Sequence, residues 1–146
     1  MRIIEENIHI QASGTRVWEV LTEFARYSEW NPFILEVSGE ALAGSRLKVR
    51  ILPPGGKAMT FKPLVLTATP GVELRWTGHL GLPGFFDGDH RFRIEGAGDN
   101  QVLFSQSEQF RGVLVPLFPG KLFERVRRGF VEMNEALKHR VEKLSV

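Results

Sequence analysis

Three polar side chains, His90, Gln106 and Glu108, fall at positions where alternation along the chain predicts a buried side chain. His90 lies on one predicted strand, and the other two lie on the next. A buried ionisable group pairs, changes its pKa or meets solvent in a cavity, because burying an unpaired charge is costly. His90 and Glu108 could therefore act together as acid and base. The alternatives are half-exposed positions at strand ends, or a bulge at Gly88 that reverses the faces.

Several other kinds of catalytic site are excluded by the sequence. There is no cysteine, which rules out disulfides, thiolate catalysis and cysteine-ligated zinc. The glycine-rich nucleotide fingerprint, the phosphate-binding loop, the HExxH motif and the Gly-x-Ser-x-Gly elbow are all missing. The four histidines are widely scattered along the chain. We therefore expect neither a metal site nor a cofactor.

Length and charge narrow the class of protein. The 146 residues suffice for one domain, residues 1–146, with a sizeable core. Nineteen Lys and Arg against seventeen Asp and Glu leave a net charge of +2, which is too small for a nucleic-acid-binding surface. No apolar run resembles a signal peptide or reaches the length of a membrane span. We therefore expect a cytoplasmic protein that does not bind nucleic acid.

The elements that would position these residues follow from hydrophobic periodicity. Residues 3–10 predict a first strand, and residues 16–32 predict two short helices, with Ser13 or Thr15 as the cap of the first. Pro63, inside a later predicted strand, indicates a bulge or an edge position. The further predicted strands are residues 34–40, 47–51, 59–69, 72–77, 85–95 and 102–110. Short turns between them predict an antiparallel meander.

The last predicted element is a long helix over residues 119–144. Its apolar residues recur every three or four positions and form a single stripe. Such a helix is about 40 Å long, and its stripe needs a large apolar surface, which the meander supplies. The stripe consists of Phe123, Val126, Phe130, Met133, Leu137, Val141 and Leu144. The helix is also basic, which is typical of a solvated face. One alternative is that its basic side chains contact an acidic lipid surface or an acidic partner. Another is that Arg125 contacts the carboxylate of a ligand.

Two stretches resemble a known family. They are residues 12–32, ASGTRVWEVLTEFARYSEWNP, and residues 74–92, LRWTGHLGLPGFFDGDHRF. Both are similar to the polyketide cyclase/dehydrase-like branch of the SRPBCC (START/Bet v 1-like) superfamily, and the resemblance covers essentially the whole chain. It implies an α+β helix-grip fold, with a curved antiparallel sheet of about seven strands around the C-terminal helix. It also implies a cavity between sheet and helix, often holding an apolar ligand.

Our favoured hypothesis is binding or transport of a small hydrophobic molecule in that cavity. The first alternative is a cyclase or dehydratase that acts on an aromatic or polyketide substrate with His90 and Glu108. The second is a protein–protein interaction module that uses either the apolar loops at residues 78–84 and 112–118 or the basic last helix. These loops either form the cavity mouth or fold back onto the last helix. The expected ligand-binding residues are Trp30, Phe61, Trp76, Phe86, Phe92, Phe104, Gln106, Phe110, Val126 and Phe130.

Some properties stay open at this stage. The protein could be a monomer or a homodimer through an apolar loop patch, because exposed apolar patches usually mark interaction sites. Peripheral membrane contact through the basic helix is a further alternative. The chain alone does not decide whether the protein is an enzyme.

Overall fold

The computed structural model describes residues 1–144, and the side chain of Leu144, the last residue of the predicted stripe, lies outside what it describes. Within this range the chain forms eight strands, two α-helices and two 3-10 helices. In chain order these are β1 (Arg2–Ile10), α1 (Gly14–Thr22), η1 (Phe24–Glu29), β2 (Ile34–Ser38), β3 (Lys48–Ile51), β4 (Met59–Phe61), β5 (Leu64–Thr69), β6 (Glu73–His79), β7 (Asp87–Gly96), β8 (Val102–Arg111), η2 (Val115–Leu117) and α2 (Gly120–Leu144).

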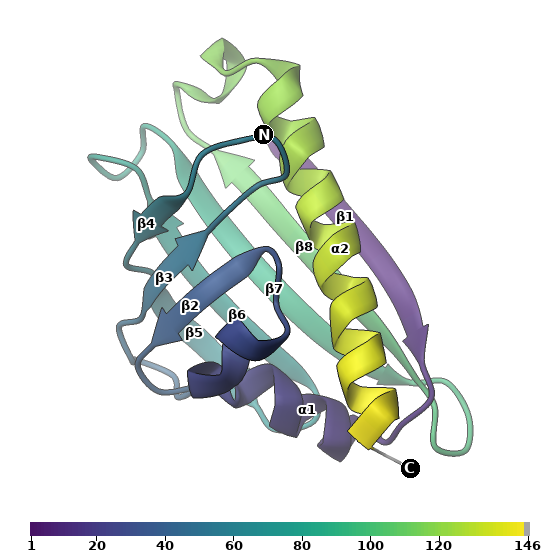
Figure 1. The fold of residues 1–146 in the computed structure, drawn as a ribbon. Helices are drawn as coiled ribbons and strands as arrows, with labels where there is room; N and C mark the ends of the chain where they lie inside the picture. The colour runs from purple at the N-terminus through teal and green to yellow at the C-terminus, as the bar shows by residue number, and fades with distance from the viewer. Residues whose placement is uncertain (145–146) are drawn as a thin grey trace.

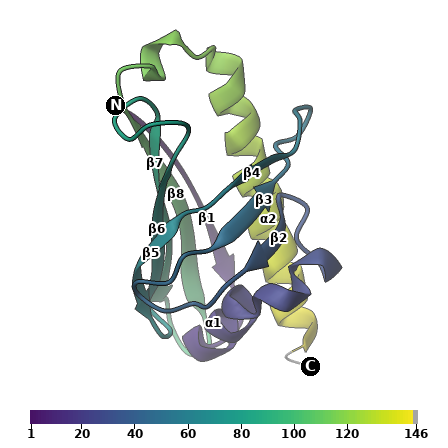
Figure 2. The ribbon, with the colours of Figure 1, turned by 90° about the vertical axis from the view of Figure 1, so that its left-hand side faces the viewer.

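The strands form two antiparallel sheets. The larger has the order β1-β8-β7-β6-β5, and the smaller has the order β2-β3-β4. Figures 1 and 2 show α2 lying across one face of the five-stranded sheet, with the three-stranded sheet beside it and α1 below. This arrangement confirms the predicted α+β fold, in which a curved antiparallel sheet wraps around a long C-terminal helix.

The two sheets meet at Pro63. The sequence predicts one strand over residues 59–69, but the structure divides it into β4 and β5, which belong to different sheets. Proline has no N–H for a sheet ladder, so the pairing pattern breaks beside it. The seam is held by the N–H of Leu47, which donates to the Pro63 carbonyl at 2.9 Å, and by the N–H of Val65, which donates to the Ser45 carbonyl at 2.9 Å. Dividing this predicted strand accounts for eight strands instead of about seven.

Strand β7 is regular at the position where a bulge could have reversed it. It pairs residue by residue with β6 from Asp87 to Arg93 and with β8 from Asp87 to Gly96, without a shift at Gly88. His90 is therefore opposite Trp76 on one side and Glu108 on the other. The face predicted from alternation is the face that the structure turns inward.

The segment after β1 differs in detail from the prediction. Ser13 caps α1 by accepting a hydrogen bond from the Arg16 N–H at 3.2 Å. The second of the two short helices predicted over residues 16–32 is η1, a 3-10 helix that spans Phe24–Glu29. Tyr27 is buried there, and its hydroxyl donates a hydrogen bond to the Leu21 carbonyl. Burial raises the pKa of the Tyr27 phenol, so this donor stays protonated.

Helix α2 buries the predicted stripe against the large sheet. Its buried apolar residues are Phe123, Val126, Phe130, Met133, Leu137 and Val141. The far end of the helix is tied down by Glu142, which accepts hydrogen bonds from the Gln11 N–H at 2.9 Å and from Lys138 at 2.6 Å. The Gln11 N–H, followed by the Lys138 ammonium, lowers the pKa of Glu142.

A glycine in the middle of α2 marks a close crossing. A Cβ placed on Gly129 would lie 2.3 Å from Cδ1 of Phe33, closer than real Cβ contacts come. The Phe33 ring meets the Phe130 ring edge-on, with centroids 5.7 Å apart. Glycine inside a helix costs about 1 kcal/mol relative to alanine, and here it makes room for an aromatic ring. This crossing brings Phe33 to the inner side of α2.

Candidate functional site

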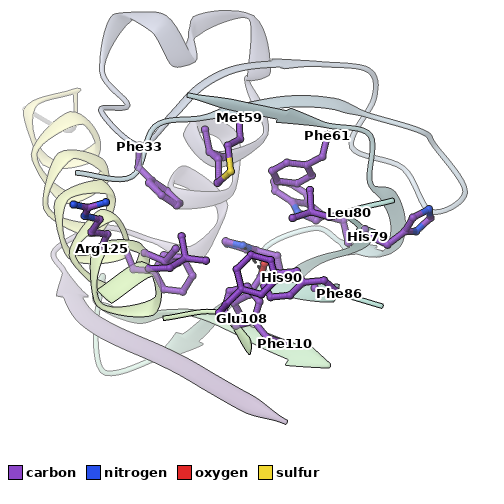
Figure 3. A pocket seen from close by; sticks show the side chains of 18 of the residues that line it. Phe33, Met59, Phe61, His79, Leu80, Phe86, His90, Glu108, Phe110 and Arg125 are labelled. Carbon is purple, nitrogen blue, oxygen red and sulfur yellow. Dashed lines mark ion pairs between the residues drawn. The ribbon is translucent and has the colours of Figure 1, made fainter. Parts of the chain in front are cut away.

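A cavity of about 410 Å³ lies between the two sheets and α2. Ligand sites in proteins typically span about 300–1,000 Å³ and are mostly apolar with a few polar groups. Figure 3 shows side chains from β4, the large sheet and α2 converging on this space. The lining residues are Phe33, Ile51, Met59, Phe61, Trp76, Gly78, His79, Leu80, Phe86, Gly88, His90, Glu108, Phe110, Phe118, Pro119, Lys121, Leu122, Arg125, Val126 and Phe130.

Most of the residues predicted to face a ligand lie on this lining. They are Phe61, Trp76, Phe86, His90, Glu108, Phe110, Val126 and Phe130. Four others lie elsewhere within the described chain. Phe92, Phe104 and Gln106 are fully buried behind the lining. Trp30 packs edge-on against Tyr27 beside η1, with ring centroids 5.1 Å apart.

Several lining residues were not among the predicted site residues. Ile51 and Met59 have the inward parity of their strands, so alternation signals their position. Phe33 comes from the turn before β2, and no pattern in the sequence places it at the cavity. His79, expected in a loop, is the last residue of β6 and lines the cavity.

The polar side chains form a hydrogen-bonded chain behind the cavity wall. Nε2 of His90 lies 3.0 Å from Oε1 of Gln106, and Nε2 of Gln106 donates to Oδ1 of Asn134 at 2.9 Å. Asn134 in turn donates through Nδ2 to the backbone carbonyl of Glu6 in β1 at 3.1 Å. Gln106 and Asn134 are buried, so this chain crosses the core from the edge strand to His90.

This chain fixes the direction of each hydrogen bond. The Glu6 carbonyl can only accept, so Asn134 presents its amide nitrogen to it and its oxygen to Gln106. Gln106 must then donate to Asn134, which leaves its own oxygen to accept from His90. His90 therefore carries a hydrogen on Nε2. Its other ring nitrogen, Nδ1, is left facing Glu108.

Glu108 approaches that second nitrogen without completing a hydrogen bond. Its Oε2 lies 3.1 Å from Nδ1 of His90, but the two groups are not aligned as donor and acceptor. Oε2 is buried and has no other partner in the described part of the chain. Oε1 lies over Gly88, where an added Cβ would come within 2.8 Å of it. Buried polar atoms without hydrogen bonds are rare, and such an atom in a cavity wall is a candidate functional group.

His90 and Glu108 place two groups that can exchange protons side by side in the cavity wall. Nδ1 of His90 and Oε2 of Glu108 can each bind or release a proton. The arrangement is thus chemically able to act as an acid or, after losing that proton, as a base.

The two apolar loops meet at one end of the cavity. The N–H groups of Val113 and Leu114 donate to the carbonyls of Gly84 and Phe85, at 3.1 and 2.9 Å. Leu80 from the first loop and Phe118 from the second line the cavity, so these loops border its mouth. Leu82, Val113 and Leu117 of these loops and the adjoining Phe85 are exposed, whereas Val115 is buried.

A second buried acid belongs to the other face of the sheet. Asp89 precedes His90 in β7 and therefore points away from the cavity. It accepts two hydrogen bonds from the Arg75 guanidinium, and this contact raises the pKa of Arg75. The pair is a structural ion pair and leaves His90 and Glu108 as the acid–base pair of the cavity.

Metal-ligand clusters and membrane-spanning helices are both missing from residues 1–144. Across that range, no three His, Asp or Glu side chains come together in a way that could hold a metal ion. Among the helices of the same range, none is long and apolar enough to cross a membrane.

Residues 1–142 match the sequence family described as "Polyketide cyclase / dehydrase and lipid transport". The chain belongs to this family. The match confirms the predicted resemblance to the polyketide cyclase/dehydrase-like branch of the SRPBCC superfamily. The family and the fold together are consistent with either hydrophobic-ligand binding or cyclase/dehydrase chemistry.

Solved structures with the same fold support the architecture of this family member. A START superfamily protein from Mycobacterium smegmatis is 20% identical, with a TM-score of 0.76 over 97% of this chain and 98% of that one. The Zhui aromatase/cyclase from Streptomyces sp. R1128 is 16% identical, with a TM-score of 0.77 over 99% and 96%. Norcoclaurine synthase from Thalictrum flavum is 12% identical, with a TM-score of 0.68 over 99% and 96%. None of the curated proteins matches this sequence. Identities this low show a shared fold alone.

Proposed function

We propose that this protein binds a small hydrophobic molecule in the cavity between its two sheets and α2. One observation carries the proposal: about 410 Å³ of space remains among mostly aromatic and aliphatic side chains. Protein interiors are otherwise packed as densely as organic crystals, so a space of this size leaves the apolar side chains around it without packing partners. A ligand that fills it recovers the missing contacts. Membership of a family described by lipid transport and polyketide chemistry supports the same proposal.

Filling the cavity from the protein side should compete with the ligand. Val126 lines the cavity from α2 and is almost fully buried. We expect Val126→Trp to weaken binding of the neutral fluorescent probe N-phenyl-1-naphthylamine by about tenfold or more, a loss of at least about 1.4 kcal/mol. The free energy of unfolding should fall by less than the roughly 1–3 kcal/mol typical of overpacking a filled core.

The matched control is Val131→Trp, the same change on an exposed position of the same helix. It should leave probe binding unchanged. Both variants are measured by fluorescence titration and by urea unfolding. If Val126→Trp binds the probe as tightly as the unmodified protein, the probe is not in the cavity and the proposal fails.

The natural ligand can be sought directly. Native mass spectrometry on gently purified protein, followed by organic extraction, should reveal a discrete apolar adduct that the Val126→Trp variant lacks. A protein that carries no adduct and also binds no apolar probe contradicts the proposed function.

A second candidate function is proton-transfer catalysis of the cyclase or dehydratase kind. The observation that favours it is that His90 and Glu108 both line the cavity, with Nδ1 of His90 3.1 Å from Oε2 of Glu108. The described lining has no Ser, Thr or Cys, so it offers no hydroxyl or thiol nucleophile for covalent catalysis. We expect the His90 ring in a nitrogen-15 NMR spectrum to carry hydrogen on Nε2. A neutral ring protonated on Nδ1 alone would contradict this assignment, because the hydrogen-bonded chain through Gln106 would then run the other way.

A further inference from the structure

Three cations lie along one side of α2 beside the cavity mouth. Lys121, Arg125 and Arg128 are four and three residues apart, a spacing that places them on neighbouring turns of the same helix face. Lys121 and Arg125 line the cavity. Nε of Arg125 and Nη2 of Arg128 lie 3.6 and 3.8 Å from the point that a Cβ on Gly55 would occupy. The turn between β3 and β4 thus passes directly over two guanidinium groups, and we call the three cations the cationic rim.

The cationic rim has no acidic partner among the described residues. None of its three side chains forms an ion pair there, and Arg128 makes only a long contact of 3.4 Å to the Pro54 carbonyl. The neighbouring Arg127 shows what a paired cation on this helix looks like. It lies 3.1 Å from Glu6 and 3.8 Å from Glu124. Like charges held together without an anion repel each other, so the cationic rim is an electropositive site.

The acidic part of the cavity lining lies apart from the cationic rim. Glu108 is the acid among the described lining residues, and its carboxylate faces His90 and not the cationic rim. Figure 3 shows Arg125 on the α2 side of the cavity, apart from the His90–Glu108 pair. A molecule in the cavity therefore meets an unpaired positive charge at α2 and apolar rings along its body.

We propose that the cationic rim binds an oxyanion head group, a carboxylate or a phosphate, of a hydrophobic ligand whose apolar body fills the cavity. The inference rests on the proposed function and narrows it to amphipathic acids. The Arg125 guanidinium presents parallel N–H donors, which suit the paired oxygens of either head group. Because Arg125 is half-buried, its interaction with an anion is screened less than one at a fully exposed site.

The test uses three competitors with the same chain and different heads. Dodecanoate, dodecyl phosphate and 1-dodecanol each displace bound N-phenyl-1-naphthylamine from the protein at fixed pH and low salt. We expect at least one of the two anions to displace the probe about 10–100-fold more effectively than the alcohol, the range that a charged hydrogen bond supplies. The anion that displaces the probe more effectively carries the head group that the cationic rim prefers.

Two variants assign the preference to the cationic rim. In Arg125→Gln the anions should lose most of their advantage over 1-dodecanol, which is measured as the ratio of their displacement constants within that variant, so that any change in affinity for the neutral probe cancels. The control Arg127→Gln removes a cation from the same helix away from the cavity and should keep the advantage. Equal displacement by acid and alcohol in the unmodified protein, or an advantage that survives Arg125→Gln, overturns this inference and leaves the proposed function standing. An unmodified protein that binds no probe and carries no apolar adduct in native mass spectrometry defeats the proposed function itself.

Discussion

Replacing Phe104 with alanine should lower the free energy of unfolding by about 3–5 kcal/mol, as measured by urea denaturation. Phe104 is fully buried on β8, opposite Ile94 on one side and Ile8 on the other. Its ring stacks near that of Phe92, with centroids 6.1 Å apart. It does not reach the cavity lining. The void left by truncation is therefore enclosed by core atoms, which cannot collapse fully around it.

The same change at Phe130 provides the matched comparison. Phe130 is equally buried but lines the cavity from α2. Its truncation should lower both stability and affinity for N-phenyl-1-naphthylamine, because it removes ligand contacts as well as core contacts. In Phe104→Ala the probe affinity should stay close to its original value. A parallel loss of affinity in both variants would show that Phe104 contacts the ligand, as the sequence alone suggests.

The second large effect should come from the buried polar chain. Gln106→Met keeps the approximate size of the side chain but leaves Nε2 of His90 and Oδ1 of Asn134 without partners. An unsatisfied buried group costs about 1–3 kcal/mol, so this variant should lose about 2–4 kcal/mol in free energy of unfolding. Asn134→Leu should lower the free energy of unfolding by a similar amount, since it leaves the Gln106 amide and the Glu6 carbonyl without this hydrogen-bond partner.

A double-mutant cycle tests whether these residues act as one chain. The variant with both Gln106→Met and Asn134→Leu removes two groups that bond each other, so the broken contact between them is counted once. It should be more stable than the sum of the single losses predicts, by about 0.5–3 kcal/mol. Strict additivity in urea unfolding would mean that the two side chains are independent, and the argument for the Nε2 hydrogen of His90 would lose its support.

Hydrophobic alternation is sufficient to predict which face of each long strand turns inward. The parity of residues 86–94 and 104–110 predicts that His90 and Glu108 share the inner face, and the pairing of β7 with β8 confirms that they are opposite each other. The single stripe of residues 123–141 likewise predicts the buried face of α2. Both patterns succeed because burial on a regular element depends mainly on its own periodicity.

Alternation does not predict how deep in the core an inward side chain lies. That depth depends on which residues of other elements cover the side chain. Alternation gives Phe92, Phe104 and Gln106 the same inward direction as Trp76, yet they lie behind the cavity wall. Phe33 reaches the cavity because Gly129 leaves space on α2, a contact between residues almost a hundred positions apart. Pro63 indicates an irregular strand. Placing Pro63 between two sheets, however, requires knowing which strands pair with the residues before it and after it.

The smaller sheet also has an evolutionary consequence. Its contribution to the cavity, Ile51, Met59 and Phe61, is only partly buried, whereas the cavity residues Trp76 and Phe130 are buried in the main core. Substitutions in a partly buried wall cost less stability than substitutions in a close-packed core. Selection can therefore reshape this wall for a new molecule while the helix and the large sheet stay intact. This difference between the two sheets fits the structural comparisons. Structures that are only 12–20% identical to this chain share its fold over almost their whole length.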